Sequence, residues 1–144
     1  MKPALLDTGP IVALLDRNDS HHMWVLPRFD RLLGRLVTTG AVVTEATFFL
    51  QDARDGIARL FDLLENSRVE IRDSFQAPQL RAAAVLMQRY ANTPMDFADA
   101  TLVVLAEELE TERVLTLDER GFRTYRHGKG RAFRLLLQDG TDDA

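Results

Sequence analysis

The sequence predicts an α/β fold in which a mainly parallel central sheet of four to five strands has helices on both faces. Short apolar runs alternate with longer segments whose apolar residues recur at helical spacing. That alternation favours a parallel sheet covered on both sides. Sites in such folds form beyond the carboxyl ends of the strands, so polar residues at strand ends are the first functional candidates.

The N-terminal part of the chain contains one predicted strand and two predicted helices. Residues 4–6 are apolar and predict a buried strand that ends at Asp7. Pro10 suits the first turn of a helix that runs to Leu15, because proline lacks an amide that would be unpaired there anyway. Residues 21–33 predict a second helix.

The middle of the chain predicts two strands and two helices. Residues 36–39 form a strand candidate that Gly40 ends, and residues 41–51 a helix. Residues 69–71 alternate like a strand. Residues 54–65 predict a helix because apolar side chains recur along one face, at Ile57, Leu60, Phe61 and Leu64.

The C-terminal part predicts two further helices and two strands. Residues 79–90 form the first helix, and Thr93-Pro94-Met95-Asp96 opens the second, which reaches about Leu109. Residues 113–117 predict a strand that ends at Asp118, and residues 133–137 predict the last strand.

Length and composition indicate one folded domain, expected at residues 1–138, with an acidic tail at residues 139–144. Of the 144 residues, 46% are hydrophobic and 28% are charged, an ordinary globular balance. The chain has no cysteine, which excludes disulfides and thiolate metal sites and fits a reducing cytosol. We find neither a signal peptide nor a membrane-spanning run and expect a cytoplasmic protein.

The net charge of −4 and the pI of about 5.3 argue against nucleic-acid binding when taken alone. One segment reverses that sign: residues 120–134 contain no Asp or Glu. From this segment we predict an RNA-binding surface at Arg120, Arg123, Arg126, Lys129 and Arg131. Because the segment starts directly after Asp118, we expect its cations to lie near the edge of the sheet where that carboxylate and the other candidate acids gather. Phe122 and Tyr125 either stack on unpaired bases or belong to the core.

Four carboxylates stand in apolar surroundings, where a lone charge is costly. Asp7 and Asp118 each end an apolar strand, and each also fits a helix N-cap or turn. Glu45 is the single charged residue from position 41 to 50, in a helix that we expect to be buried most of the way round. Asp99 precedes a long apolar helical run.

Asp96 lies three residues before Asp99, on the same helix face. It fits a capping box opened by Thr93, whereas Asp99 lacks any such structural role. We therefore treat Asp99 as a strong ligand candidate and Asp96 as a secondary one.

Gathered together, these acids would repel one another unless a divalent cation were bound. All-oxygen ligands select Mg²⁺ or Mn²⁺, and the three histidines have no zinc-ligand spacing. Such a cluster suits hydrolysis of a phosphodiester bond. The sequence has no Gly-x-Ser-x-Gly nucleophile motif and no phosphate-binding Gly-x-x-x-x-Gly-Lys loop.

The chain resembles the PIN-domain family, and within it the VapC toxin ribonucleases of VapBC toxin–antitoxin pairs. Four pieces carry the resemblance, in order along the whole chain: Leu-Asp-Thr at Asp7, the helix acid Glu45, Phe97-Ala98-Asp99-Ala100, and Leu115-Thr116-Leu117-Asp118 followed by Phe122.

The resemblance implies a Rossmann-like sheet and RNA cleavage with Mg²⁺ or Mn²⁺. It makes Asp7, Glu45, Asp99 and Asp118 the catalytic metal ligands, with Thr8 and Thr116 orienting them. It also implies a cognate antitoxin and a homodimer. His22 either is a feature of the family's first helical hairpin or is an ordinary residue at a helix start.

Two other functions remain open from the sequence. A haloacid-dehalogenase-like phosphatase also places an Asp after its first strand, but Gly9 stands where that chemistry needs a second Asp. A catalytically silent binding module would use the same carboxylates for structure alone.

Overall fold

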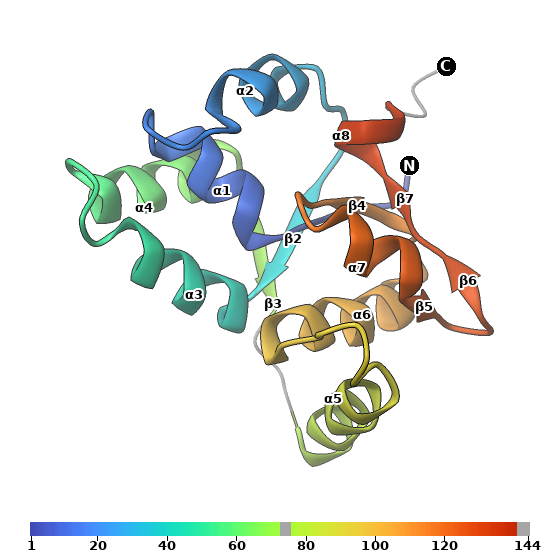
Figure 1. Ribbon diagram of the computed structural model, residues 1–144. Helices are drawn as coiled ribbons and strands as arrows, with labels where there is room; N and C mark the ends of the chain where they lie inside the picture. Colours follow the sequence, from blue (N-terminus) through green and yellow to red (C-terminus); the bar gives the residue numbers. More distant parts are fainter. Residues whose placement is uncertain (73–75, 141–144) are drawn as a thin grey trace.

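The computed structural model describes residues 1–72 and 76–140 and contains a five-stranded, wholly parallel sheet (Figure 1). The strand order is β3-β2-β1-β4-β7, so β1 lies in the centre and the chain winds outward from it in both directions. The strands are β1 (Ala4–Leu6), β2 (Leu36–Thr39), β3 (Glu70–Arg72), β4 (Arg113–Leu115) and β7 (Arg134–Leu135). The predicted parallel sheet is therefore confirmed.

Helices cover both sides of this sheet, as predicted (Figure 1). Four lie on one side: α1 (Thr8–Leu15), α2 (His22–Asp30), α3 (Gly40–Leu50) and α4 (Gly56–Asn66). On the other side, α5 (Ala77–Arg89) packs on α6 (Phe97–Leu109). Short helices α7 (Glu119–Thr124) and α8 (Leu136–Asp139) flank the C-terminal strands.

The core explains why the central elements form where they do. Every residue of β1, β2 and β4 is buried, as expected for parallel strands covered on both faces. Helix α6 buries an unbroken run at positions 100–106, and Leu102 and Val103 are fully enclosed. Strand β3 is exposed along its whole length, as befits the edge of the sheet.

The C-terminal region differs from the prediction. The strand expected at residues 133–137 is only β7, because the chain turns into α8 at Leu136. Helix α7 and an antiparallel hairpin of β5 (Arg126–His127) and β6 (Arg131–Ala132) were not predicted. Each is too short to show a period in the sequence.

Two further points concern the ends of the described chain. Asp139 belongs to α8, whereas Asp142 and Asp143 of the predicted acidic tail lie outside the described residues. Within the described residues, every helix is too short or too polar to span a bilayer.

Candidate active site

The carboxyl ends of the two central strands meet at one cleft. Strands β1 and β4 are paired, with Leu6 opposite Leu115, so the residues that follow them emerge side by side. The cleft has a volume of about 400 Å³. Its lining includes all five predicted acids, Asp7, Glu45, Asp96, Asp99 and Asp118, and also Thr8, Gly9, Val12, Asp19, Phe49 and Leu117.

Asp7 is buried at the base of this cleft, with 6% of its surface exposed. One carboxylate oxygen, Oδ1, accepts a 2.8 Å hydrogen bond from the Thr8 amide, because Asp7 is the N-cap of α1. The other oxygen, Oδ2, accepts a 2.7 Å bond from the Thr116 hydroxyl. The N-cap role considered from the sequence is therefore real and coexists with a position in the cleft.

Thr116 joins Asp7 to the loop that carries Asp118. Its hydroxyl oxygen accepts a 3.0 Å hydrogen bond from the Asp118 amide, and the same hydroxyl donates a hydrogen bond to Asp7. Asp118 in turn caps α7, since its Oδ1 accepts from the Gly121 amide at 3.0 Å. The backbone that positions Asp118 is thereby fixed from both sides.

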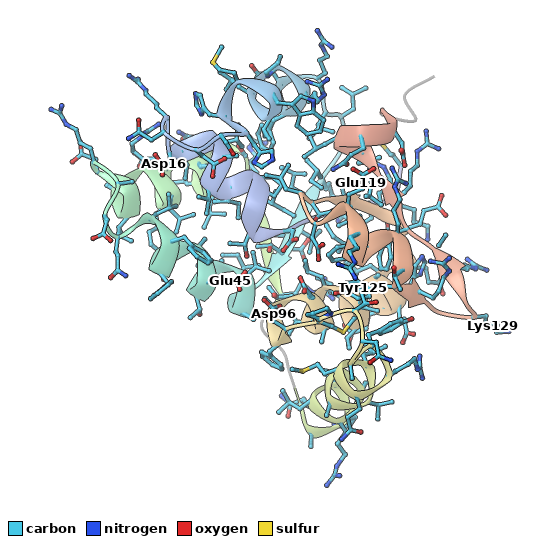
Figure 2. All side chains as sticks on the ribbon, viewed as in Figure 1. Asp16, Glu45, Asp96, Glu119, Tyr125 and Lys129 are labelled. Atoms are coloured by element: carbon cyan, nitrogen blue, oxygen red, sulfur yellow. The ribbon has the colours of Figure 1, made fainter. Side chains whose placement is uncertain are left out.

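Glu45 enters the cleft from α3, but not for the reason that the sequence suggested. The helix buries only the stripe of Val42, Ala46 and Leu50, so the expectation of burial most of the way round is wrong. Phe48 and Phe49 are 66% and 54% exposed. Glu45 itself is half-buried at the boundary of that stripe, and Figure 2 shows it beside Asp96 in the centre of the molecule.

Asp96 and Asp99 form a reciprocal capping box at the start of α6. The Asp99 amide donates to Asp96 Oδ1 at 2.8 Å, and the Asp96 amide donates to Asp99 Oδ2 at 3.3 Å. Helix α6 therefore begins at Phe97, three residues later than the Thr93 motif predicted. Asp99 does have a structural role, as the second acid of this capping box. Aspartate at the N-cap competes well with Thr93 because its carboxylate also favours the positive end of the helix dipole.

Burial and the nearness of other negative charges raise the pKa values of three of these carboxylates. Burial raises the pKa of Asp99 to about 8, and the negative charges of Asp7, Asp96 and Asp118 contribute to the rise. Burial likewise raises the pKa of Asp7 to about 6, although the bonds from Thr116 and Thr8 oppose it. Burial and the charge of Asp96 raise the pKa of Glu45, and the Thr8 hydroxyl opposes that shift.

The donor set fits a hard divalent cation in its chemistry. The cleft presents carboxylate oxygens whose mutual repulsion a cation would relieve. The buried Thr8 hydroxyl lies near the Glu45 carboxylate without completing a hydrogen bond to it. In residues 1–72 and 76–140, however, no three His, Asp or Glu side chains are close enough to form a ready-made metal site. The carboxylates share the cleft without forming a closed ligand group.

Sequence reasoning missed Asp19, which lines the same cleft. It lies between α1 and α2, and its Oδ1 accepts a 2.8 Å bond from the His21 amide. No local signal marks it, because the loop brings it to the cleft through tertiary folding. The nearby His22 has its Nδ1 2.6 Å from the Ala13 carbonyl oxygen, which ties the start of α2 to α1.

The basic segment does not lie at the cleft as a unit. Arg131 lines a separate pocket with Lys2, Glu110 and His127, near the amino ends of the strands. Figure 2 shows Lys129 at the tip of the β5–β6 hairpin, away from Glu45 and Asp96. The expectation that these cations cluster at the carboxylate edge is therefore wrong for Arg131 and Lys129.

The remaining cations of this segment differ in whether their side chains are already engaged in ion pairs or hydrogen bonds. Arg123 forms ion pairs with Asp139 at 2.8 Å and Glu119 at 3.0 Å. Arg126 donates to three backbone carbonyls of its own segment. Arg120 is exposed in the first turn of α7, two residues after Asp118.

Phe122 and Tyr125 are core residues, so stacking on RNA bases is wrong for both. Both rings are fully buried and pack edge to face at 5.2 Å. The Tyr125 hydroxyl donates to the Pro94 carbonyl at 2.9 Å, which holds the chain just before α6.

Comparisons with known proteins agree with this architecture. The sequence model of the PIN domain family matches residues 4–128. The chain is 28% identical over 134 residues to a Mycobacterium tuberculosis protein named ribonuclease VapC26, covering 92% of this chain and 98% of that protein. The crystal structure of M. tuberculosis VapC20, described as a Sarcin-Ricin loop cleaving toxin, superposes with a TM-score of 0.72 at 16% identity, covering 81% of this chain and 90% of that one.

Proposed function

The chain belongs to the PIN-domain family, and from this premise we propose that it is a metal-dependent endoribonuclease, the toxin of a toxin–antitoxin pair. The observation that carries the proposal is the convergence of Asp7, Glu45, Asp99 and Asp118 on one cleft at the carboxyl ends of β1 and β4. The likeness to a protein named ribonuclease VapC26 supports the choice of RNA as substrate.

We propose Asp7, Glu45, Asp99 and Asp118 as the ligands of Mg²⁺ or Mn²⁺, with Asp96 as a secondary candidate. A bound cation of this kind activates water and stabilises the charge that develops on the phosphate during hydrolysis. Thr116 keeps Asp7 ionised and oriented, because its hydroxyl donates to the carboxylate and would lose that acceptor if Asp7 were protonated at Oδ2. We assign Thr8 the corresponding role of orienting Glu45, because its hydroxyl lies next to that carboxylate.

The cellular setting is part of the same proposal. We propose that the protein is cytoplasmic, that residues 1–138 form its working domain, and that it binds a cognate antitoxin and forms a homodimer. For RNA contacts, Arg120 is the best placed of the predicted cations, because it is exposed and begins the helix that Asp118 caps.

The test is a cleavage assay with purified protein and structured RNA, with either cation or with EDTA. We expect cleavage with Mg²⁺ or Mn²⁺, none in EDTA, and a loss of about 10²-fold or more in Asp7→Asn. Asp62→Asn is the matched control, since Asp62 is exposed on α4 and lines no part of the cleft. Turnover of a phosphomonoester without RNA cleavage would favour the phosphatase alternative instead.

A further inference from the structure

A second cavity adjoins the carboxylate cleft, and Phe49 lines both. This groove has a volume of about 820 Å³. It lies between the end of α1, the segment after it, the end of α3 and the start of α4. Besides Phe49 its lining residues are Leu15, Asp16, Arg17, Asn18, Asp52, Ala53, Arg54, Asp55 and Arg59.

Phe49 stands one helical turn after Glu45, so the two side chains share a face of α3. The ring is 54% exposed, and among the exposed phenylalanine rings of the described residues Phe49 is the one that lines the cleft. Phe48 packs against it edge to face, with the ring centroids 5.4 Å apart at 76°. A planar apolar surface is thus exposed beside the carboxylates.

The walls of the groove are firmly built. Arg59 spans the groove and donates to the Leu15 carbonyl at 2.8 Å, which ties α4 to α1. A side chain at Gly56 would place its Cβ 2.1 Å from the Leu50 carbonyl oxygen, so this turn admits only glycine without rearrangement. Arg17 and Arg54 are exposed on the rim and form no ion pair within the described residues.

We propose that Phe49 is a stacking platform for an unpaired base of the RNA strand next to the scissile phosphate, and that the groove receives the strand beyond it. The inference rests on the proposed function, because it takes the cleft as the place of cleavage. Every base has a π-face, so stacking suits an exposed ring without hydrogen-bonding groups. Arg17 and Arg54 offer cations to the phosphates that follow.

The charges of the groove make the ring its main attraction for RNA. Arg17, Arg54 and Arg59 are offset by Asp16, Asp52 and Asp55, so the lining is balanced in formal charge. A groove of this kind gains little from phosphate contacts alone. Stacking on the ring should therefore contribute more to RNA binding in this groove than ionic contacts with the phosphates.

Fluorescence of a single-stranded RNA that contains 2-aminopurine, titrated with protein in EDTA, tests the platform without cleavage. We expect quenching by the wild-type protein, and binding at least about 5-fold weaker with little quenching for Phe49→Ala. Phe49→Trp should keep both signals. Because the ring is uncharged, Phe49→Ala should leave the salt dependence of binding unchanged.

The matched control is Phe61→Ala, which removes another half-exposed ring, on α4, that lines neither the cleft nor the groove. It should bind and quench like the wild type. In the cleavage assay Phe49→Ala should raise KM far more than it lowers kcat. If Phe49→Ala bound RNA and quenched its fluorescence as well as Phe61→Ala and the wild type, the platform would be overturned. Phe49 would then be left as a contact for a protein partner. Failure of the wild type to cleave any RNA would instead overturn the proposed function.

Discussion

The Thr116 hydroxyl donates a 2.7 Å hydrogen bond to Asp7 Oδ2 across the pair of central strands. Both residues are buried, so water cannot replace the bond if it is removed. We expect Thr116→Val, which keeps the shape of the side chain, to lower kcat by roughly 10- to 100-fold. The pKa of Asp7 should rise further, because Thr116 is the group that lowers it most.

Thr116→Ser provides the control for this substitution, since it restores the hydroxyl and removes only a methyl group. Its activity should stay near that of the wild type. The pKa of Asp7, followed by NMR of the labelled carboxyl carbon, separates this role from a general loss of packing. An unchanged Asp7 pKa in Thr116→Val would contradict the assigned hydrogen bond.

The metal-free protein should become less stable as pH rises. The pKa values of Asp7 and Asp99 are raised in the folded state, to about 6 and about 8, above the ordinary value of 3.8. The folded protein therefore holds protons that the unfolded chain releases, and stability present below pH 4 is lost progressively up to about pH 8. Urea unfolding in EDTA across this range measures the slope.

Asp99→Asn should flatten the upper part of this profile, between about pH 6 and pH 8, because it removes the group that titrates there. Asp62→Asn, on an exposed part of α4, should leave the profile as it is. Stability that is constant or rising from pH 5 to pH 8 in the wild type would refute the crowding of charges described above.

Divalent cations should reverse that loss at neutral pH. A cation bound only by the folded protein stabilises it by about 2.7 kcal/mol at one hundred times its dissociation constant. For a domain of this size this corresponds to a rise in Tm of several degrees. Differential scanning calorimetry with Mn²⁺ should show the rise in the wild type and in Asp62→Asn, and a much smaller one in Asp7→Asn.

The sequence was a good guide to the sheet because parallel strands are buried on both faces and read as short apolar runs. Strands β1 and β2 begin and end at the predicted residues. Helix α7 and the β5–β6 hairpin escaped prediction, since tertiary contacts and not local periodicity define them. The Tyr90 hydroxyl, for example, accepts from the Arg126 amide at 3.0 Å and fixes the start of β5.

The site could be predicted only in part, because sequence reveals which residues end a strand but not what a loop brings near. Asp7 and Asp118 follow from their positions after β1 and β4. Glu45 was identified from an apolar helix that proved to be half exposed, so the residue was found by a wrong argument. Asp19 reaches the cleft from a loop, and Arg131 leaves it through a hairpin.

Arg120 lies near the cleft, whereas Arg131 lies in a separate pocket, so we expect substitutions of these two arginines to have different effects. Arg120→Gln should weaken RNA binding several-fold and lower the salt slope by about one, because one phosphate contact is lost near the cleft. Arg131→Gln should change neither, since Arg131 lines the pocket near the amino ends of the strands. Binding isotherms at several salt concentrations measure both quantities. Equal losses in the two variants would mean that RNA also contacts the opposite edge of the sheet.

The two acids of the α6 capping box should respond oppositely to substitution. Asp96 accepts the shorter bond, at 2.8 Å, so Asp96→Ala should be less stable than Asp96→Asn by about 1 kcal/mol. Asparagine keeps the capping oxygen and removes the charge, so the pair of variants isolates the cap. Asp99 accepts only at 3.3 Å and carries a crowded charge above about pH 8. Asp99→Asn should therefore be more stable than the wild type at pH 8.5 without metal, and this gain should be almost gone at pH 4, where the unfolded wild-type chain also keeps much of its Asp99 proton. A loss of stability at both pH values, measured by urea unfolding, would show that the cap outweighs the repulsion.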